Sequence, residues 1–204
     1  MRKGVFALRG KRRRDFNEVF GQDLAAMHRA STERFVSEGR YGFSSDNYIG
    51  TGPQKNTPTD SFIEFFAECR LRPQFERAYA YFSESEHHDI ESFLSRLDKY
   101  LIEPEFPSLL HGDLWGGNYM VGNDGSAWLI DPAVYVGHFE ADIAMTELFG
   151  GFPYEFYDAY WSAMGGQNGY ADRRDIYNLY HLLNHLNLFG GGYLSSVRSI
   201  LRRF

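Results

Sequence analysis

Apolar side chains recur at intervals of three and four residues through most of the chain, which is the period of an amphipathic helix. In residues 15–31 this spacing places one apolar face on a helix, and Asp15 is suited to cap its first turn. The same pattern predicts further helices along the chain. Their expected ranges are 59–71, capped by Thr59 or Asp60, then 72–83, 87–102, 140–150, 154–164 and 173–204.

Two short apolar runs break the helical pattern. Residues 119–121 (YMV) and 127–130 (AWLI) flank the turn sequence GNDGS, which predicts an antiparallel hairpin. No other segment is predicted as a strand, and strands do not alternate with helices as they do in a doubly wound sheet. The expected fold class is therefore mainly α with a small β-hairpin (α+β).

Composition fits a folded domain of 204 residues, or one large lobe of a bigger protein. Cys69 is the single cysteine, which excludes an intrachain disulfide and favours a reducing compartment. No apolar run approaches the 18 residues or so that a membrane-spanning helix needs, and no signal peptide is evident. A cytoplasmic protein without a membrane partner is expected.

Charge is distributed unevenly along the chain. The first 14 residues carry seven basic side chains and no acidic one, whereas the remainder carries 14 basic and 27 acidic side chains. An acidic body argues against a nucleic-acid partner. The basic tip could contact a polyanion, a membrane or a nucleotide phosphate, or it could be a solvated tail.

The hairpin brings three polar residues into one region. Asn118 immediately precedes the first strand and Asp131 immediately follows the second, so the hairpin places an amide oxygen beside a carboxylate. Such hard oxygen ligands suit Mg²⁺, which keeps its other positions for phosphates and water. Asp113, in the loop HGDLWGGN, could orient a hydroxyl and accept its proton, and Gly116 and Gly117 would let that loop curl. This is the arrangement that phosphoryl transfer needs, although each residue alone has a purely structural interpretation.

The order Asp, four residues, Asn, hairpin, Asp is similar to the catalytic loop and metal site of protein-kinase-like phosphotransferases. Three stretches, namely HGDLWGGN, IDPAVYVGHFEADIAMTELFGGF and DNYIGTGPQKNTPTDSFIEFFAECRLRPQ, together resemble the fructosamine kinase (ketosamine-3-kinase) family. The resemblance runs from about Phe16 to the last residue. It implies ATP-dependent phosphorylation, with Mg²⁺, of the sugar 3-hydroxyl of a ketosamine on an amine or protein, which leads to protein deglycation.

The resemblance also implies roles for individual residues. Asp113 would be the catalytic base, and Asn118 and Asp131 would hold Mg²⁺. Trp115 would lie against the sugar, the alternative being a core residue. The remaining two residues would support the loop: His111 would brace it, and Asp142 would bind its backbone, cap a helix, or both.

The resemblance further implies a fold with a second, N-terminal lobe, which would supply a Gly-rich loop and a lysine for the phosphates. Neither is recognisable in this sequence. We therefore expect the C-terminal lobe of a kinase-like fold over residues 15–204, with the N-terminal lobe largely absent. Residues 1–14 would be a basic tail with a remnant of the inter-lobe linker, in which Phe6 and Leu8 could touch adenine.

A chain without that lobe is expected to have weak or no kinase activity alone, to self-associate, or to receive the lobe from another chain. Two alternative functions remain open: a non-catalytic kinase-like binding module, and a related small-molecule kinase of the aminoglycoside or choline type. The acceptor itself, whether fructosamine or ribulosamine, is not specified by the sequence.

The remaining patterns favour structural interpretations. His181 and His185 have the spacing of zinc peptidases, but Leu182 stands where those enzymes have Glu, so a packed or hydrogen-bonded pair is expected. The stretch FGGG at residues 189–192 indicates a hinge or a helix break. Six aromatic residues are expected in the core: Phe65, Phe66, Tyr79, Tyr81, Tyr177 and Tyr180.

Overall fold

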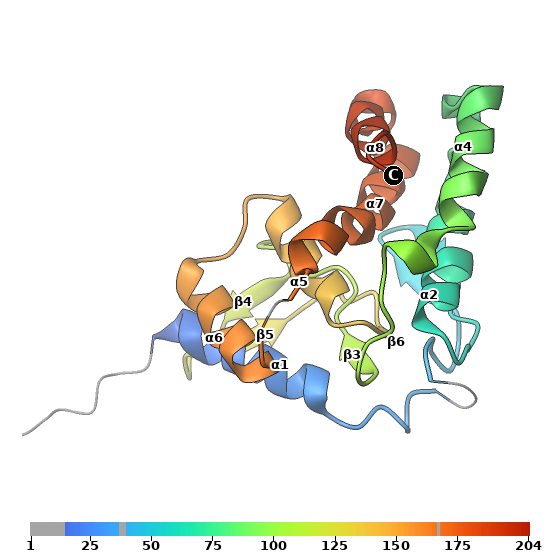
Figure 1. The fold of residues 1–204 in the computed structure, drawn as a ribbon. Helices are drawn as coiled ribbons and strands as arrows, with labels where there is room; N and C mark the ends of the chain where they lie inside the picture. The colour runs from blue at the N-terminus through green and yellow to red at the C-terminus, as the bar shows by residue number, and fades with distance from the viewer. Residues whose placement is uncertain (1–14, 37–39, 167) are drawn as a thin grey trace, which may run out of the picture.

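Helices make up most of the fold, as the sequence predicts. A computed structural model describes residues 15–36, 40–166 and 168–204. Residues 1–14, with the predicted adenine contacts Phe6 and Leu8 and the basic tip, lie outside the described residues. In the described part, the helices are accompanied by three short pairs of strands (Figure 1).

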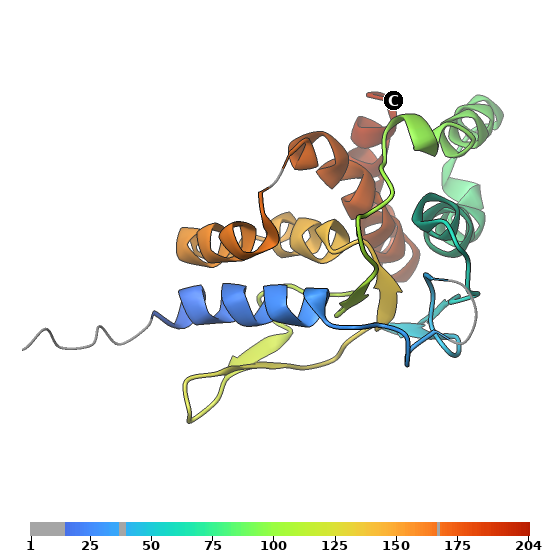
Figure 2. The ribbon, with the colours of Figure 1, turned by 60° about the horizontal axis from the view of Figure 1, so that its bottom comes forward.

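Helix α1 (Phe16–Arg29) begins where the sequence predicts, because Oδ1 of Asp15 accepts a hydrogen bond of 2.8 Å from the backbone N–H of Asn17. It packs against α6 (Tyr154–Met164), and the two helices lie side by side (Figure 2). Gly21 permits this close approach, since a Cβ there would lie 2.3 Å from the backbone oxygen of Phe156.

The two helices predicted over 59–71 and 72–83 form one continuous helical segment. It consists of α2 (Phe62–Phe65), a π-helical turn (Phe66–Leu71) and α3 (Arg72–Arg77). The predicted cap at Thr59 or Asp60 is wrong, because the side chain of Ser61 caps α2 by accepting from the N–H of Glu64. Pro73 lies in the first turn of α3 and does not separate the two helices.

The π-helical turn contains a fully buried arginine. The guanidinium of Arg70 donates to the backbone oxygens of Lys55 and Cys69 and to Oδ1 of Asn56, at 2.6, 2.9 and 2.8 Å. It also lies 3.9 Å from the ring centre of Tyr135. These contacts tie the helical segment to the loop after β2 and to strand β6.

Helix α4 (Glu84–Leu94) is shifted relative to the predicted range of 87–102. The side chain of Ser83 accepts from the N–H of Glu86, and Oε2 of Glu86 accepts from the N–H of Ser83. This capping box begins the helix before His87, which therefore lies within it. After Leu94 the chain continues through a 3₁₀ turn (Leu97–Lys99) instead of extending the helix.

The predicted hairpin is confirmed, and two further strand pairs were not predicted. In the hairpin, Tyr119 of β4 lies opposite Leu129 of β5. All three pairs are antiparallel: β1 (Asn47–Ile49) with β2 (Gly52–Gln54), β3 (Ser108–Leu110) with β6 (Tyr135–Gly137), and β4 (Tyr119–Val121) with β5 (Ala127–Leu129). Each strand has only three residues, too few to display an alternating pattern.

Four helices follow the strands in the chain. They are α5 (Glu140–Leu148), α6, α7 (Tyr170–Phe189) and α8 (Leu194–Leu201). The break predicted at 189–192 is confirmed, because α7 ends at Phe189 and a 3₁₀ turn (Gly191–Tyr193) precedes α8. Helix α7 packs against α3, α5 and α8. Among the described residues, no helix has the length and apolar character needed to cross a bilayer.

The aromatic residues divide between core and surface. Phe65, Phe66, Tyr177 and Tyr180 are buried in the single large core cluster, as predicted. The prediction is wrong for Tyr79 and Tyr81, which are 64% and 37% exposed. Both lie on a short 3₁₀ turn (Tyr79–Tyr81) at the surface, where Tyr79 stacks on His87.

Candidate active site

Two strand pairs bring the loops of the site together. The β3–β6 pair sets Leu110 opposite Tyr135, and the backbone N–H of Ala133 donates to the backbone oxygen of His111 at 2.8 Å. At the end of the β4–β5 hairpin, the N–H of Ile130 donates to the backbone oxygen of Asn118 at 3.0 Å. The loop of residues 111–118 and the segment of residues 130–133 therefore lie against each other.

The tight turn of this loop depends on Gly112. Its φ is +81°, and a Cβ there would lie 2.0 Å from the backbone oxygen of Ala133. The sequence analysis assigned the curl to Gly116 and Gly117, and these two glycines form a second turn of the loop, in which the N–H of Asn118 donates to the backbone oxygen of Trp115 at 2.9 Å. A Cβ at Gly117 would lie 2.4 Å from the ring of Trp115. A Cβ at Gly116 would meet no atom within 4 Å.

Asp142, in the first turn of α5, holds the backbone of the loop. Its Oδ2 accepts from the N–H of His111 at 2.7 Å, and its Oδ1 accepts from the N–H of Gly112 at 2.8 Å. On the other side, Nε2 of His28 lies 3.2 Å from Oδ2. Burial alone would raise the pKa of this carboxyl, but its hydrogen bonds and the charge of His28 lower it below the ordinary value.

His111 connects the loop to the segment that carries Asp131. Its side chain is buried, and its Nδ1 accepts from the backbone N–H of Asp113 at 3.3 Å. The other ring nitrogen, Nε2, then carries the proton and donates to the backbone oxygen of Ile130 at 2.9 Å. The imidazole therefore links the backbone N–H of Asp113 to the backbone oxygen of Ile130, the residue that precedes Asp131.

Two side chains lie beside Asp113. Nδ2 of Asn118 donates to the backbone oxygen of Asp113 at 2.8 Å and lies 3.4 Å from its Oδ2. Nδ1 of His181, on α7, lies 3.8 Å from its Oδ1. Burial raises the pKa of the Asp113 carboxyl above its ordinary value, which makes its carboxylate a better proton acceptor.

Asp113, Asn118 and Asp131 line one cavity of about 510 Å³. Asp131 is exposed to it and has a φ of +51°, a left-handed conformation that is uncommon for an aspartate. No lysine or arginine is among the described residues that line this cavity, and its two carboxylates belong to Asp113 and Asp131. Its lining consists of Tyr48, Gly50, Asp113, Trp115, Asn118, Asp131, Pro132, Ala133, Asn184, His185, Leu188 and Phe189.

The donor set on this cavity fits Mg²⁺. Because the amide nitrogen of Asn118 is engaged with Asp113, its amide oxygen stays available as a ligand beside the carboxylate of Asp131. No group of three or more His, Cys, Asp and Glu residues with metal-binding geometry occurs among the described residues. A cation held by one amide and one carboxylate would keep its remaining positions for phosphate and water.

Trp115 is an exposed residue of the cavity wall. Its indole is 39% exposed and packs edge-to-face against Phe149 at a ring-centre distance of 6.5 Å. The alternative of a core residue is therefore excluded. Part of Trp115 is therefore accessible to a ligand in the cavity.

The sequence analysis did not assign several residues to this site. Asn184, His185 and Phe189 reach it from α7, and Tyr48 reaches it from β1. The expected hydrogen bond of the histidine pair is made with the backbone, since Nδ1 of His185 lies 2.8 Å from the backbone oxygen of His181. The residues of α7 that line the cavity have the same spacing along the helix as its core residues. The sequence pattern of α7 therefore does not distinguish cavity residues from core residues.

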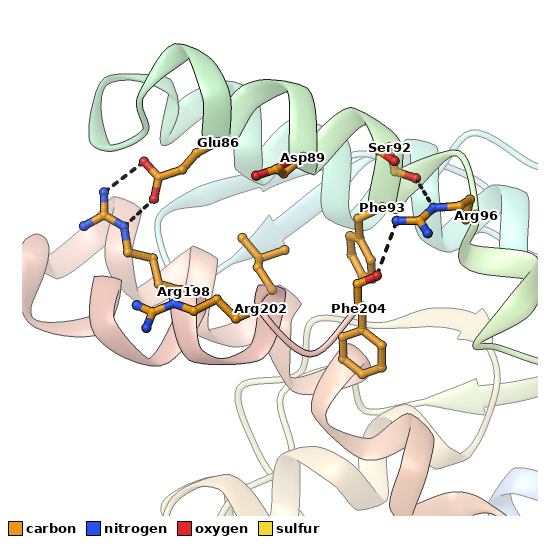
Figure 3. A pocket seen from close by; sticks show the side chains of 9 residues that line it. Glu86, Asp89, Ser92, Phe93, Arg96, Arg198, Arg202 and Phe204 are labelled. Atoms are coloured by element: carbon orange, nitrogen blue, oxygen red, sulfur yellow. Dashed lines mark hydrogen bonds and ion pairs between the residues drawn. The ribbon is translucent and has the colours of Figure 1, made fainter.

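A second hollow lies between α4 and α8, and it shares no residue with the Asp113 cavity (Figure 3). Its volume is about 330 Å³. Arg198 is paired with Glu86, and Arg96 donates to the backbone oxygens of Ser92 and Phe204 (Figure 3). Arg198 and Arg96 already have partners, and Arg202 alone does not make an anion site, so we assign none to this groove.

Comparison with protein families gives a match over almost the whole chain. The family model described as fructosamine kinase matches residues 6–204. A Synechocystis protein named a probable ketoamine kinase is 42% identical over 184 residues, which are 90% of this chain and 60% of the relative. The chloroplastic protein-ribulosamine 3-kinase of Arabidopsis thaliana is 44% identical over 186 residues, 89% of this chain and 55% of the relative. The chain thus spans little more than half the length of these relatives.

Solved structures give the same assignment. A crystal structure from Thermobifida fusca, named after fructosamine-3-kinase, has a TM-score of 0.81 and 38% identity, and covers 91% of this chain and 63% of that one. A second, from Haemophilus somnus, has a TM-score of 0.79 and 27% identity, and covers 95% and 65%. On the strength of the family match and these shared folds, the chain belongs to the fructosamine kinase family.

Proposed function

We propose that this chain carries the acceptor and metal side of an ATP-dependent kinase that phosphorylates the sugar 3-hydroxyl of ketosamines. The observation that carries the proposal is the meeting of Asp113, Asn118 and Asp131 on one cavity. Relatives named ketoamine kinase and protein-ribulosamine 3-kinase support the same reaction class. Glycated amines or proteins are the corresponding substrates, and their phosphorylation would serve deglycation.

Asp113 is the catalytic base of this proposal. Its carboxylate accepts the proton of the acceptor hydroxyl while the hydroxyl oxygen bonds to the γ-phosphorus of ATP, and the bond from that phosphorus to the ADP oxygen breaks. Asn118 steadies the base through its bond to the backbone oxygen of Asp113. Holding the hydroxyl in line with the phosphorus is the main contribution of these groups.

Asn118 and Asp131 would hold Mg²⁺, which when bound neutralises phosphate charge. Because the cavity lining has no lysine or arginine among its described residues, its carboxylates would repel the phosphates of ATP without a cation. The exposed position of Asp131 at the cavity suits such a shared cation. His111 keeps Asp131 in register with Asp113 by its two hydrogen bonds.

Asp142 and Trp115 have supporting roles in the proposal. Asp142 fixes the loop by accepting from two consecutive backbone N–H groups. Trp115 offers an exposed indole face to the C–H face of the sugar. Neither residue takes part in proton transfer.

The ATP-binding side of the reaction would belong to the N-terminal lobe. The sequence predicts weak or no activity for the chain alone, self-association, or an N-terminal lobe from another chain, and all three stay predictions. The comparisons do not support the loss of a lobe, since the family model matches residues 6–204. They do not show impaired activity either.

Binding and transfer can be measured separately. We expect calorimetry to detect Mg²⁺-dependent ATP binding that is lost in Asp131→Ala and kept in Asp113→Asn, because Asp131 is a ligand of the cation in this proposal and Asp113 is not. Labelled phosphate transfer to a ribose-derived lysine ketosamine is expected to fall about 10²- to 10⁴-fold in Asp113→Asn. Asp23→Asn, a change at an exposed carboxylate of α1, is the control and should behave as wild type. Absence of Mg²⁺-dependent ATP binding in the wild-type chain would contradict the kinase proposal and favour a non-catalytic binding module, whereas weak transfer alone agrees with the low activity predicted for the chain by itself.

A further inference from the structure

His181 is a buried histidine whose position beside Asp113 has no role in the reaction as described so far. It lies on α7 and is 3% exposed. Its Nδ1 has no hydrogen-bond partner among the described residues, and Oδ1 of Asp113 lies 3.8 Å from it. A buried ring nitrogen without a partner destabilises the folded state, so such an atom calls for a physical reason.

The surroundings of His181 keep its ring neutral. Burial lowers the pKa of this imidazole to about 3, and the positive charge of His185 acts in the same direction. A neutral imidazole carries one N–H and one lone pair. Facing a carboxylate, Nδ1 is stabilised when it carries the proton and destabilised when it carries the lone pair.

We propose that His181 is a positioning residue for phosphoryl transfer, which donates from Nδ1 to Oδ1 of Asp113 and fixes the rotation of that carboxylate. The proposal rests on the proposed function. Oδ2 of Asp113 already faces Nδ2 of Asn118 at 3.4 Å, so the two donors hold the carboxylate from opposite oxygens. The separation of 3.8 Å between Nδ1 and Oδ1 is longer than a hydrogen bond, so the proposal requires it to shorten when substrate binds. Hydrogen bonds around a catalytic group are often long without substrate and tighten in the complex.

A neutral donor suits this position better than a charged one. A protonated histidine or a lysine would form an ion pair with Asp113 and weaken it as a proton acceptor. A neutral N–H orients the carboxylate at a much smaller cost to its basicity. His181 is rigidly placed for this task, because its two neighbours on α7, Tyr180 and Leu182, are buried in the core cluster.

The kinetic test compares two replacements of one residue. In His181→Leu, kcat for the ketosamine is expected to fall about 10- to 100-fold with KM unchanged, the range for losing one hydrogen bond to a charged group. In His181→Asn, whose amide N–H can take the place of Nδ1–H, most of the lost kcat should return. Equal kcat values for His181→Leu and wild type, or equal losses in both variants, would overturn the proposal.

A matched control separates positioning from the general cost of removing a buried imidazole. His138 is also buried, its Nε2 also has no hydrogen-bond partner among the described residues, and burial lowers its pKa to about 3. It does not line the Asp113 cavity. His138→Leu should therefore lower stability and leave the kcat of the folded fraction unchanged.

The tautomer of His181 decides the proposal independently of turnover. Nitrogen-15 NMR of the chain is expected to show His181 as the neutral Nδ1–H form, with an Nδ1 resonance that moves in Asp113→Asn. The Nε2–H form would overturn the inference even in an active enzyme. If the wild-type chain shows no Mg²⁺-dependent ATP binding while the Nδ1–H form is found, the proposed function fails and the contact between His181 and Asp113 stands.

Discussion

At the scale of single residues, the first turn of the catalytic loop depends on Gly112. Gly112 combines a φ of +81° with a Cβ position that lies 2.0 Å from the backbone oxygen of Ala133. Gly116, four residues later, has open space around its Cβ position. The two glycines look alike in the sequence, and only the backbone geometry distinguishes them.

We therefore expect opposite results from two alanine substitutions. Gly112→Ala should lower the free energy of unfolding by about 2–4 kcal/mol, because the added methyl group forces the strained loop away from Ala133. Gly116→Ala should stay within about 0.5 kcal/mol of wild type. Urea unfolding measures both. A Gly116→Ala variant that is the more destabilised of the two would place the essential turn where the sequence analysis put it.

Residues that are close along the chain could be predicted to meet, and residues from distant helices could not. Asp113, Asn118 and Asp131 are joined by a hairpin, so their meeting follows from a local turn signal. His181 reaches Asp113 only because α7 crosses the loop, a contact that depends on the packing of the whole chain. No pattern within α7 indicates that one of its buried histidines faces a carboxylate.

At the scale of elements, α4 and α8 are joined by one charged contact. Arg198 of α8 donates to both carboxylate oxygens of Glu86, which also completes the capping box of α4. The hydrogen bonds from Arg198 lower the pKa of Glu86 to about 2. The sequence analysis began this helix at residue 87, because a cap formed by serine and glutamate is easily mistaken for part of a polar loop.

The charge of Glu86 should make part of the stability depend on pH. Because its pKa is lower in the folded state, its contribution is complete above its ordinary pKa of 4.5 and is lost as the pH falls towards 2. We expect Glu86→Gln to lower Tm by about 2 °C at pH 7, and this difference to shrink between pH 5 and pH 2. Glu84→Gln, at an exposed residue of the same turn, is the control. A difference that does not change with pH would contradict the assignment.

The length of an element decided whether it could be predicted. Helices of two or more turns show their period, and the glycine break after α7 was identifiable. The β1–β2 and β3–β6 pairs have three residues per strand, and the strand Tyr135–Gly137 is buried throughout, so neither alternation nor a turn signal marks it. Yet β3 and β6 are the strands that set the catalytic loop beside Asp131.

At the scale of the whole molecule, one buried network joins parts of the chain that are far apart in sequence. Asp142 of α5 binds the backbone of the catalytic loop, and His28 of α1 connects this carboxylate to the hydroxyl of Tyr160 on α6, at 3.2 and 2.7 Å. Helices α1 and α6 pack against each other around this point (Figure 2). The network therefore couples the position of the loop to the assembly of the three helices.

Replacing Asp142 by asparagine tests this coupling. Each carboxylate oxygen of Asp142 accepts from one backbone N–H, but an asparagine amide has only one oxygen to accept with. Asp142→Asn should therefore lower the free energy of unfolding by about 2–4 kcal/mol at pH 7. Tyr160→Phe, which removes only the far end of the network, should cost about 1 kcal/mol. Because the pKa of Asp142 is lowered in the folded state, the advantage of wild type over Asp142→Asn is complete above pH 4 or so and is lost at lower pH.

Urea unfolding across this pH range measures the loss, with Asp98→Asn at an exposed turn as the control. Phosphate transfer by the folded fraction adds a second measurement, since a displaced loop would carry Asp113 away from Asn118 and lower kcat. If Asp142→Asn were as stable as wild type at pH 7, the carboxylate would not hold the loop. If it were destabilised yet equally active when folded, the network would serve the assembly of α1, α5 and α6 without controlling the position of the catalytic base.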